Sequence, residues 1–257
     1  MKKMVILVLL ITNALITGRA DAAHPLATDD TGTQGVDGSQ FEISQDFGRS
    51  KTNGVISKED VANMTLTRGW TDRLDIFLGA ALQATKDPGS YEGTRRGAGD
   101  TAMGIKWRYQ ETEGMSLGLK GSVTLPTGDE DKGLGKGRTT QSVLHMTQME
   151  FDALTLLVNI GYTYNDNKTA VVAERKNLWN ASAAGLYLVS ETTTVLLEVG
   201  VRRQAALAGG KNPSFATLGV IWHLTKELDF DVGLKLKLNS EETDRTVGVG
   251  ITKRWGK

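Results

Sequence analysis

From about residue 38 to Trp255 the sequence repeats one unit, in which about ten alternating apolar and polar residues precede a stretch rich in Gly, Asp, Asn, Ser and Thr. The clearest copies are Leu228–Leu238 and Thr246–Trp255. Strict alternation has the two-residue period of a β-strand with one apolar and one polar face. A soluble sandwich buries its apolar faces, whereas an outer-membrane barrel turns them towards lipid. The chain is therefore restricted to one of these two all-β architectures.

Twelve segments carry the strand pattern, and most reach the roughly 9–11 residues that a transmembrane strand needs. The sixth and eighth are the weakest, because both of their faces mix apolar and small polar residues. The twelve are Phe41–Phe47, Ala62–Arg68, Leu74–Leu82, Ala102–Tyr109, Met115–Leu125, Ser142–Met149, Leu154–Tyr164, Leu178–Leu188, Thr193–Arg202, Phe215–Leu224, Leu228–Leu238 and Thr246–Trp255.

The connections between these segments alternate between long and short. Gly48–Val61 is long and Gly69–Arg73 is short; Lys86–Asp100 is long and Gln110–Gly114 is short, and the alternation continues along the chain. Outer-membrane barrels have this asymmetry, with short periplasmic turns and longer outer loops, whereas a sandwich has no reason to keep it. We therefore predict a single transmembrane, antiparallel, up-and-down β-barrel of about twelve strands.

Aromatic residues gather at the strand ends, as the girdles at the two membrane interfaces require. Trp70, Trp107 and Trp222 fall at expected periplasmic ends, and Phe47 and Tyr162 at outer ends. The last predicted strand closes on an aromatic residue, a feature by which the barrel assembly machinery recognises its clients. We expect that machinery to be a partner of this chain.

The N-terminus has the features of an export signal that is cleaved. Lys2 and Lys3 precede a short apolar segment, and small residues follow at the cleavage position near Ala22. We predict a signal peptide over residues 1–22, a separate segment over 23–38 and the barrel over 39–257.

Charge and cysteine content narrow the function classes. Cleavage removes three of the 30 basic and one of the 30 acidic residues, which leaves a net charge of about −2. That balance excludes a general nucleic-acid-binding surface. The chain has no cysteine, so it has no thiolate metal site and no lipoprotein anchor. We expect no cofactor and no metal, and a monomer in the outer membrane of a Gram-negative bacterium in contact with lipid and lipopolysaccharide.

Three segments resemble a known family. They are His24–Gly35, Gly97–Asp100, and Thr124–Asp129 with its glycine-rich sequel Lys132–Gly137. Together they are similar to the proteins described as "putative MetA-pathway of phenol degradation", and the likeness extends over essentially the whole mature chain. The resemblance implies an outer-membrane barrel that carries small molecules, with aromatic or hydrophobic catabolic substrates as the expected permeants.

If the apolar positions face lipid, the opposite positions face the lumen. There we expect charged residues that either pair across neighbouring strands in a filled barrel or choose the permeant of an open one. Lys106, Arg108 and Lys120 on adjacent strands form a basic patch that would favour anions. Glycines at expected inward positions, such as Gly121 and Gly233, leave room for a folded-in segment. The full candidate set for permeation is Lys106, Arg108, Lys120, Glu198, Arg202, Asp229, Asp231, Lys235, Lys237 and Arg254.

The segment before the first strand is a candidate for entry into the lumen. It carries Asp29 and Asp30, whose carboxylates would meet the basic patch and partly plug the barrel. The alternative is a periplasmic tail that stays outside.

Two other function classes remain to be weighed. A non-transporting structural or adhesive barrel would have a closed lumen and act through its loops. An outer-membrane hydrolase would need a Ser and a His within hydrogen-bond reach. Ser142 and His145 differ by three positions and therefore lie on opposite faces of their strand, and His223 has no Ser beside it. We therefore predict a channel for passive uptake and not an enzyme.

Overall fold

The computed structural model describes residues 24–52, 54–86, 93–166, 174–207 and 210–256. The expected signal peptide, residues 1–22, lies outside these ranges. Within them no helix is long and apolar enough to cross a membrane.

All thirteen strands of the described residues belong to one sheet. They are β1 (Ser39–Thr52), β2 (Val55–Thr71), β3 (Leu74–Lys86), β4 (Thr94–Ala98), β5 (Thr101–Thr112), β6 (Met115–Leu125), β7 (Thr140–Phe151), β8 (Leu154–Tyr164), β9 (Asn177–Ser190), β10 (Thr193–Arg202), β11 (Ser214–His223), β12 (Leu228–Lys237) and β13 (Arg245–Trp255).

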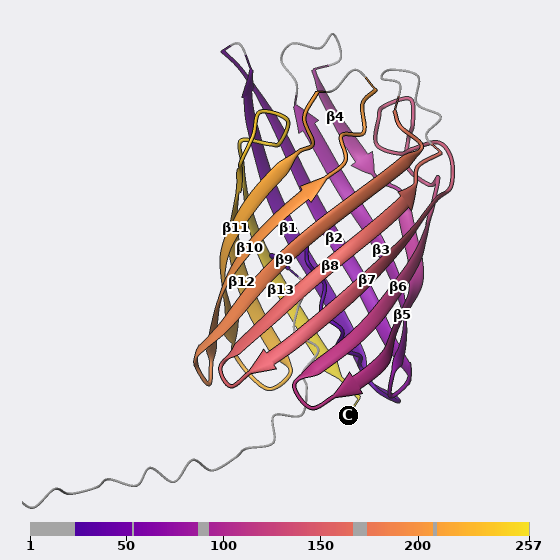
Figure 1. The fold of residues 1–257 in the computed structure, drawn as a ribbon. Coiled ribbons are helices and arrows are strands. Elements are labelled where there is room, and N and C mark those ends of the chain that lie inside the picture. Colours follow the sequence, from indigo (N-terminus) through magenta and orange to yellow (C-terminus); the bar gives the residue numbers. More distant parts are fainter. Residues whose placement is uncertain (1–23, 53, 87–92, 167–173, 208–209, 257) are drawn as a thin grey trace, which may run out of the picture.

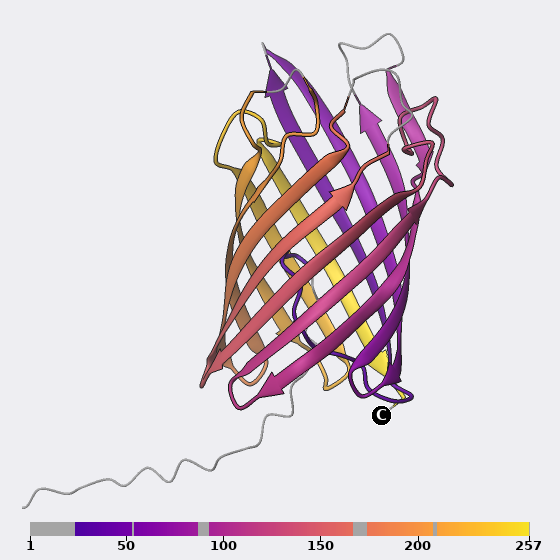
Figure 2. The same ribbon diagram turned by 45° about the vertical axis from the view of Figure 1, so that its right-hand side comes forward.

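The sheet closes on itself into a barrel (Figures 1 and 2). Around the barrel each strand pairs antiparallel with the next one in sequence, except that β5 pairs with β3, because the short β4 pairs with β3 alone. The ring closes where β1 pairs with β13, from Ser39↔Trp255 to Arg49↔Arg245. Closure leaves no open sheet edge, which is what a β-structure needs in hydrocarbon, where an unpaired backbone group costs several kcal/mol. The prediction of a twelve-stranded up-and-down barrel is confirmed.

Two predicted loops are wrong. Gly48–Val61 is not a long loop, because β1 and β2 pair as far as Thr52↔Val55 and extend as a hairpin above the barrel (Figure 1). The apolar alternation stops there because both faces of the hairpin lie in water. Lys86–Asp100 contains β4, a short continuation of the β5 position that also pairs with β3.

Strands six and eight of the prediction are longer than the pattern indicated. They correspond to β7 and β9, which run over twelve and fourteen residues. In the middle of β9 the residues on both faces are small or weakly polar, since Ala183 and Gly185 alternate with Ser182 and Ala184. Pairing to both neighbours fixes the strand where its own pattern is weak.

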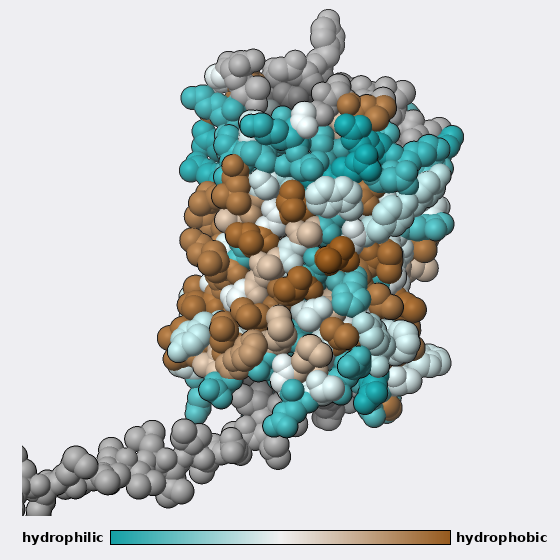
Figure 3. All heavy atoms as spheres, in the orientation of Figure 1, coloured by the Kyte–Doolittle hydropathy of each residue, from teal (hydrophilic) through white to brown (hydrophobic). Residues whose placement is uncertain are grey.

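The apolar side chains of the wall point away from the barrel axis. Ile160, for example, is 63% exposed, and Leu78, Ile105 and Leu197 are exposed too. On the face shown in Figure 3, hydrophobic side chains gather in a belt below a hydrophilic band. In a soluble protein so many exposed apolar side chains would be a liability, whereas a membrane supplies their solvent.

The inside of the barrel is not uniformly polar. Inward positions of β8 to β11 form a buried apolar cluster, against which Leu26 of the N-terminal segment packs. The cluster consists of Leu157, Ala184, Leu186, Leu196 and Ile221. The expectation of a lumen lined by charged groups is thus incomplete. The alternation along a strand shows which residues point inward, but inward residues can also be apolar.

A lipid-facing charge should destabilise the barrel, whereas the same change in a loop should not. Leu218 on β11 and Leu207 in the connection after β10 are both 54% exposed. We expect Leu218→Arg to cost about 2–4 kcal/mol of folding free energy near the bilayer midplane, and Leu207→Arg almost nothing. Urea titration of folding into phospholipid vesicles measures both. Equal effects of the two substitutions would contradict the assignment of the outer face.

Candidate functional site in the barrel lumen

The described part of the N-terminal segment, residues 24–38, runs inside the barrel (Figure 2). Six of its polar residues are buried: Thr28, Asp29, Asp30, Thr31, Thr33 and Gln34. A buried polar group is costly unless it is hydrogen-bonded, so the contacts of these residues explain why the segment stays in place.

The carboxylate of Asp29 lies between two lysine ammonium groups. Lys106 on β5 and Lys120 on β6 are direct cross-strand partners, and both point inward. Asp29 contacts Lys106 at 3.0 Å and Lys120 at 2.7 Å, and Asp30 contacts Lys106 at 2.7 Å. Two like charges directly opposite on a sheet repel, so an anion between them removes a strain that the wall itself creates.

The pKa values of the neighbouring Asp29 and Asp30 carboxyl groups are shifted in opposite directions. Burial raises the pKa of Asp29, but the charges of Lys106 and Lys120 outweigh it and hold that pKa below its usual range. For Asp30, burial together with the adjacent Asp29 charge raises the pKa despite the contact with Lys106. Asp29 therefore carries the attraction between segment and wall.

A second anchor joins the segment to β10. The Glu198 carboxylate, 1% exposed, accepts hydrogen bonds from the backbone N–H groups of Ala27 and Thr28 at 2.9 and 2.7 Å. The Thr28 hydroxyl donates a third at 2.7 Å. Three donors compensate much of the desolvation of a buried carboxylate, and they exist only when the segment is docked.

The start of the described segment lies in a groove made by glycines. A Cβ at Gly233 would lie 2.3 Å from Pro25, and one at Gly219 would lie 2.8 Å from it. The glycines Gly248 and Gly250 face the His24 ring in the same way. Inward glycines of β11 to β13 thus leave room for the segment. The predicted inward position of Gly121 is wrong, since a Cβ there would meet Ile105 on the lipid-facing side.

The His24 ring bonds to two carboxylates of the barrel wall, one on β12 and one on β1. Its Nδ1 bonds to Asp231 on β12, and its Nε2 lies 3.5 Å from Asp46 on β1. Burial lowers the pKa of His24, but the two carboxylates outweigh it and raise that pKa from 6.5 to about 9. The imidazole is therefore protonated at neutral pH and completes an ion pair that holds the segment.

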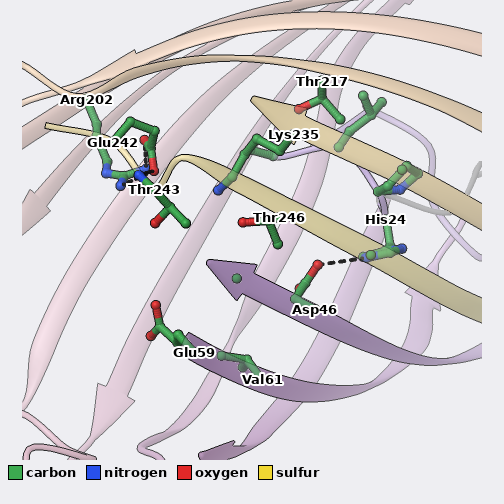
Figure 4. A pocket seen from close by; sticks show the side chains of 16 residues that line it. His24, Asp46, Glu59, Val61, Arg202, Thr217, Lys235, Glu242, Thr243 and Thr246 are labelled. Carbon is green, nitrogen blue, oxygen red and sulfur yellow. Dashed lines mark hydrogen bonds and ion pairs between the residues drawn. The ribbon is translucent and has the colours of Figure 1, made fainter. Parts of the chain in front are cut away.

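A cavity of about 320 Å³ lies beside the docked segment towards the long connections (Figure 4). His24 and Pro25 form part of its wall, and Lys235, Thr217 and Glu59 form another part. The Lys235 ammonium lies 5.3 Å from the centre of the Phe215 ring, within cation–π range. The cavity offers charges of both signs beside an aromatic face.

The remaining predicted lumen residues are separate from the Asp29 cluster. Arg108 pairs with Glu111, and Arg254 pairs with Asp229, which also bonds to His223. Near the long connections, Arg202 pairs with Glu242 and Lys237 with Asp244. The basic patch thus reduces to Lys106 and Lys120, and Arg108 is not part of the contact with the segment.

Sequence reasoning missed five anchors of the segment: His24, Leu26, Thr28, Thr31 and Gln34. The residues that could have indicated these anchors lie in the wall: the inward glycines of β12 and β13, which leave space, and the inward glutamate Glu198, which needs hydrogen-bond donors.

Two of the three family-like segments meet at the end of the barrel with long connections. Asp100, in the break between β4 and β5, accepts hydrogen bonds from the N–H groups of Gly128 and Lys136 at 2.9 and 2.7 Å. The connection 126–139 is thereby fixed, and it buries Leu134 against Gly97. The motifs Gly97–Asp100, Thr124–Asp129 and Lys132–Gly137 are therefore one interlocked unit, and His24–Gly35 is the lumen segment.

Among the hydrogen bonds of the described residues, neither His145 nor His223 bonds to a serine. Ser142 bonds to Ser122, whereas His145 bonds to Tyr109. His223 bonds to Asp229 and Thr194. Within the same ranges, no group of three or more His, Asp or Glu residues could hold a metal ion.

The family model described as "Putative MetA-pathway of phenol degradation" matches residues 26–255. The chain belongs to this family. A search of curated proteins finds no match.

Solved structures with the same fold are outer-membrane channels and porins. The COG4313 outer membrane channel from Pseudomonas putida F1 has a TM-score of 0.76 at 15% identity, over 88% of this chain and 98% of that one. The NanC porin has a TM-score of 0.59 at 7% identity, over 83% and 98%. The CymD monoaromatic hydrocarbon channel has a TM-score of 0.50 at 10% identity, over 87% and 90%. At these identities the likeness shows the fold of an outer-membrane barrel.

Neutralising Asp29 should release the segment far more than neutralising Asp30. Asp29→Asn leaves two inward lysines facing each other, and breaking a buried pair costs about 3–5 kcal/mol. Asp30 already has a raised pKa, so Asp30→Asn should cost less than about a third of that. Because the chain has no cysteine, a single Thr33→Cys reports exposure through maleimide labelling of the folded barrel. Equal labelling rates in the two variants would contradict the assigned role of Asp29.

Docking should weaken in alkali through His24. The docked pKa of about 9 lies above 6.5, so the contribution is complete below pH 6.5 and is lost as pH rises through about 9. The difference corresponds to about 3 kcal/mol of docking free energy. We expect Thr33→Cys labelling to accelerate over this range, and His24→Gln to remove that step. A wild-type rate that stays flat to pH 10 would argue against the ion pair.

Proposed function

We propose that this protein is a channel of the Gram-negative outer membrane for passive uptake of small molecules, with aromatic or hydrophobic catabolic substrates as permeants. The observation that carries the proposal is the docked N-terminal segment: a lumen wide enough to hold a peptide, closed by a few reversible polar contacts.

The chemistry of the lumen supports the substrate class. The buried cluster of Leu157, Leu186, Leu196 and Ile221 offers an apolar surface that is covered by Leu26 in the docked state. Lys120 lies 4.7 Å from the centre of the Phe77 ring, which gives the lumen an aromatic face beside a cation. Such surfaces suit a ring with one polar substituent better than a sugar or a small ion.

The family description and the outer-membrane channels of the same fold agree with this proposal. They support a transport role, and the substrate rests on the lumen chemistry and the family description together. The docked segment implies that the resting channel is narrow and that permeation follows displacement of residues 24–38.

Deletion of residues 24–37 should open the channel. In planar bilayers we expect the conductance of the deleted protein to exceed that of the mature protein by about tenfold, because the lumen loses its filling. Phenol and benzoate should enter proteoliposomes faster through the deleted form. The matched control is a barrel with Asp129→Asn, a change in an outer connection that leaves the segment intact.

The rival function is a closed structural barrel, which the filled lumen also fits. In that case the deletion would leave both conductance and uptake of the two aromatic compounds at the level of protein-free vesicles, and the transport proposal would be wrong.

A further inference from the structure

Four basic residues stand side by side on four neighbouring strands. Arg245 of β13 is the direct partner of Arg49 of β1, Arg49 is the partner of Lys58 of β2, and Lys58 is the partner of Lys86 of β3. All four are exposed. We call them the basic row. Neighbouring strands lie about 4.8 Å apart, so the row is about 14 Å long.

The basic row lies on the outer face of the barrel. Strand residues alternate between faces, and the sequence neighbours Gly48, Glu59 and Thr246 line the inner cavity. Arg49, Lys58 and Arg245 must therefore point outward. The same parity on β4 adds Arg96, which is exposed and pairs with Ala84, two residues before Lys86.

Within the described part of the chain the row keeps most of its charge, and Asp244, whose charge interacts with that of Arg245, is already paired with Lys237. Among the described residues, none of its four members takes part in an ion pair, although like charges directly opposite on a sheet repel. Other cations at the same end are paired: Lys136 with Glu174, Arg138 with Asp166 and Lys237 with Asp244. Asp60 shares the outer face, but one carboxylate does not balance the row.

The row borders the lipid-facing belt. On the same outer face, Phe47 precedes Arg49, Val247 follows Arg245 and Leu82 precedes Lys86, and all three apolar side chains are exposed. The strand ends concerned lie at the end of the barrel with the long connections (Figure 1). In an outer-membrane barrel this is the outer leaflet side. A ligand bound here would contact apolar side chains on the membrane side and cationic side chains on the side of the long connections.

We propose that the basic row binds a bisphosphorylated, acylated glycolipid of the lipopolysaccharide type in the outer leaflet. Phosphate oxygens accept charge-assisted hydrogen bonds from Arg and Lys, and Arg does so with two donors at once. The length of the row fits two phosphate groups, and the apolar residues beneath fit the acyl chains. The inference rests on the proposed outer-membrane location but not on transport.

The test measures binding of fluorescent bisphosphoryl lipid A to the full mature protein in neutral detergent. We expect Arg49→Gln with Lys58→Gln to raise the Kd about tenfold or more, since two phosphate contacts are lost. The matched control, Lys132→Gln with Arg138→Gln, removes the same charge from the same end and should change the Kd by less than about twofold. Arg49→Lys with Lys58→Arg keeps the charge and should retain binding.

Three competitors separate the possible sources of the phosphate contact. Dephosphorylated lipid A, phosphatidylglycerol and inorganic phosphate should each displace the labelled lipid poorly. Equal loss of affinity in the control variant, or equal displacement by any of the three, would overturn the proposal. Heat-modified migration on gels verifies that each variant is folded, and conductance of the double variant should match that of the wild type, which keeps this test separate from that of the channel.

Discussion

The structure depends on closure of the sheet between its first and last strands. In hydrocarbon the backbone N–H and C=O groups find no water, so each strand needs two partners. β1 meets this need by pairing with both β2 and β13, over eleven register pairs in the second case. Once the ring is closed, successive side chains of each strand face lipid and lumen in turn. The need to pair every backbone group therefore also decides which side chains meet lipid and which meet the lumen.

Closure also creates the problem that the N-terminal segment solves. A ring of this size has an interior that its own side chains do not fill, and two of its inward lysines, Lys106 and Lys120, are direct cross-strand partners. The segment supplies Asp29 for these lysines, and it donates N–H groups to the buried carboxylate of Glu198. The buried polar groups of the wall and of the segment therefore supply one another's ion pairs and hydrogen bonds.

The sequence was sufficient to predict the fold, because every second residue of a membrane-spanning strand faces lipid and is therefore apolar. It was insufficient where water lies on both faces, as in the upper β1–β2 hairpin, and where an inward face is apolar, as at Leu196 and Ile221. In the lumen, the sequence pointed to Asp29, Lys106 and Lys120 through charge and strand adjacency. It could not point to His24, whose partners Asp46 and Asp231 become its neighbours only when β12, β13 and β1 stand next to one another.

The groove of glycines has a consequence for the order in which the molecule is built. His24 and Pro25 rest against Gly233, Gly248 and Gly250, which belong to β12 and β13, the last two strands of the described chain. The first residues of the described chain thus find their seat only after the final ones have arrived. The docked position of His24 and Pro25 therefore requires that β12 and β13 already lie side by side in the sheet.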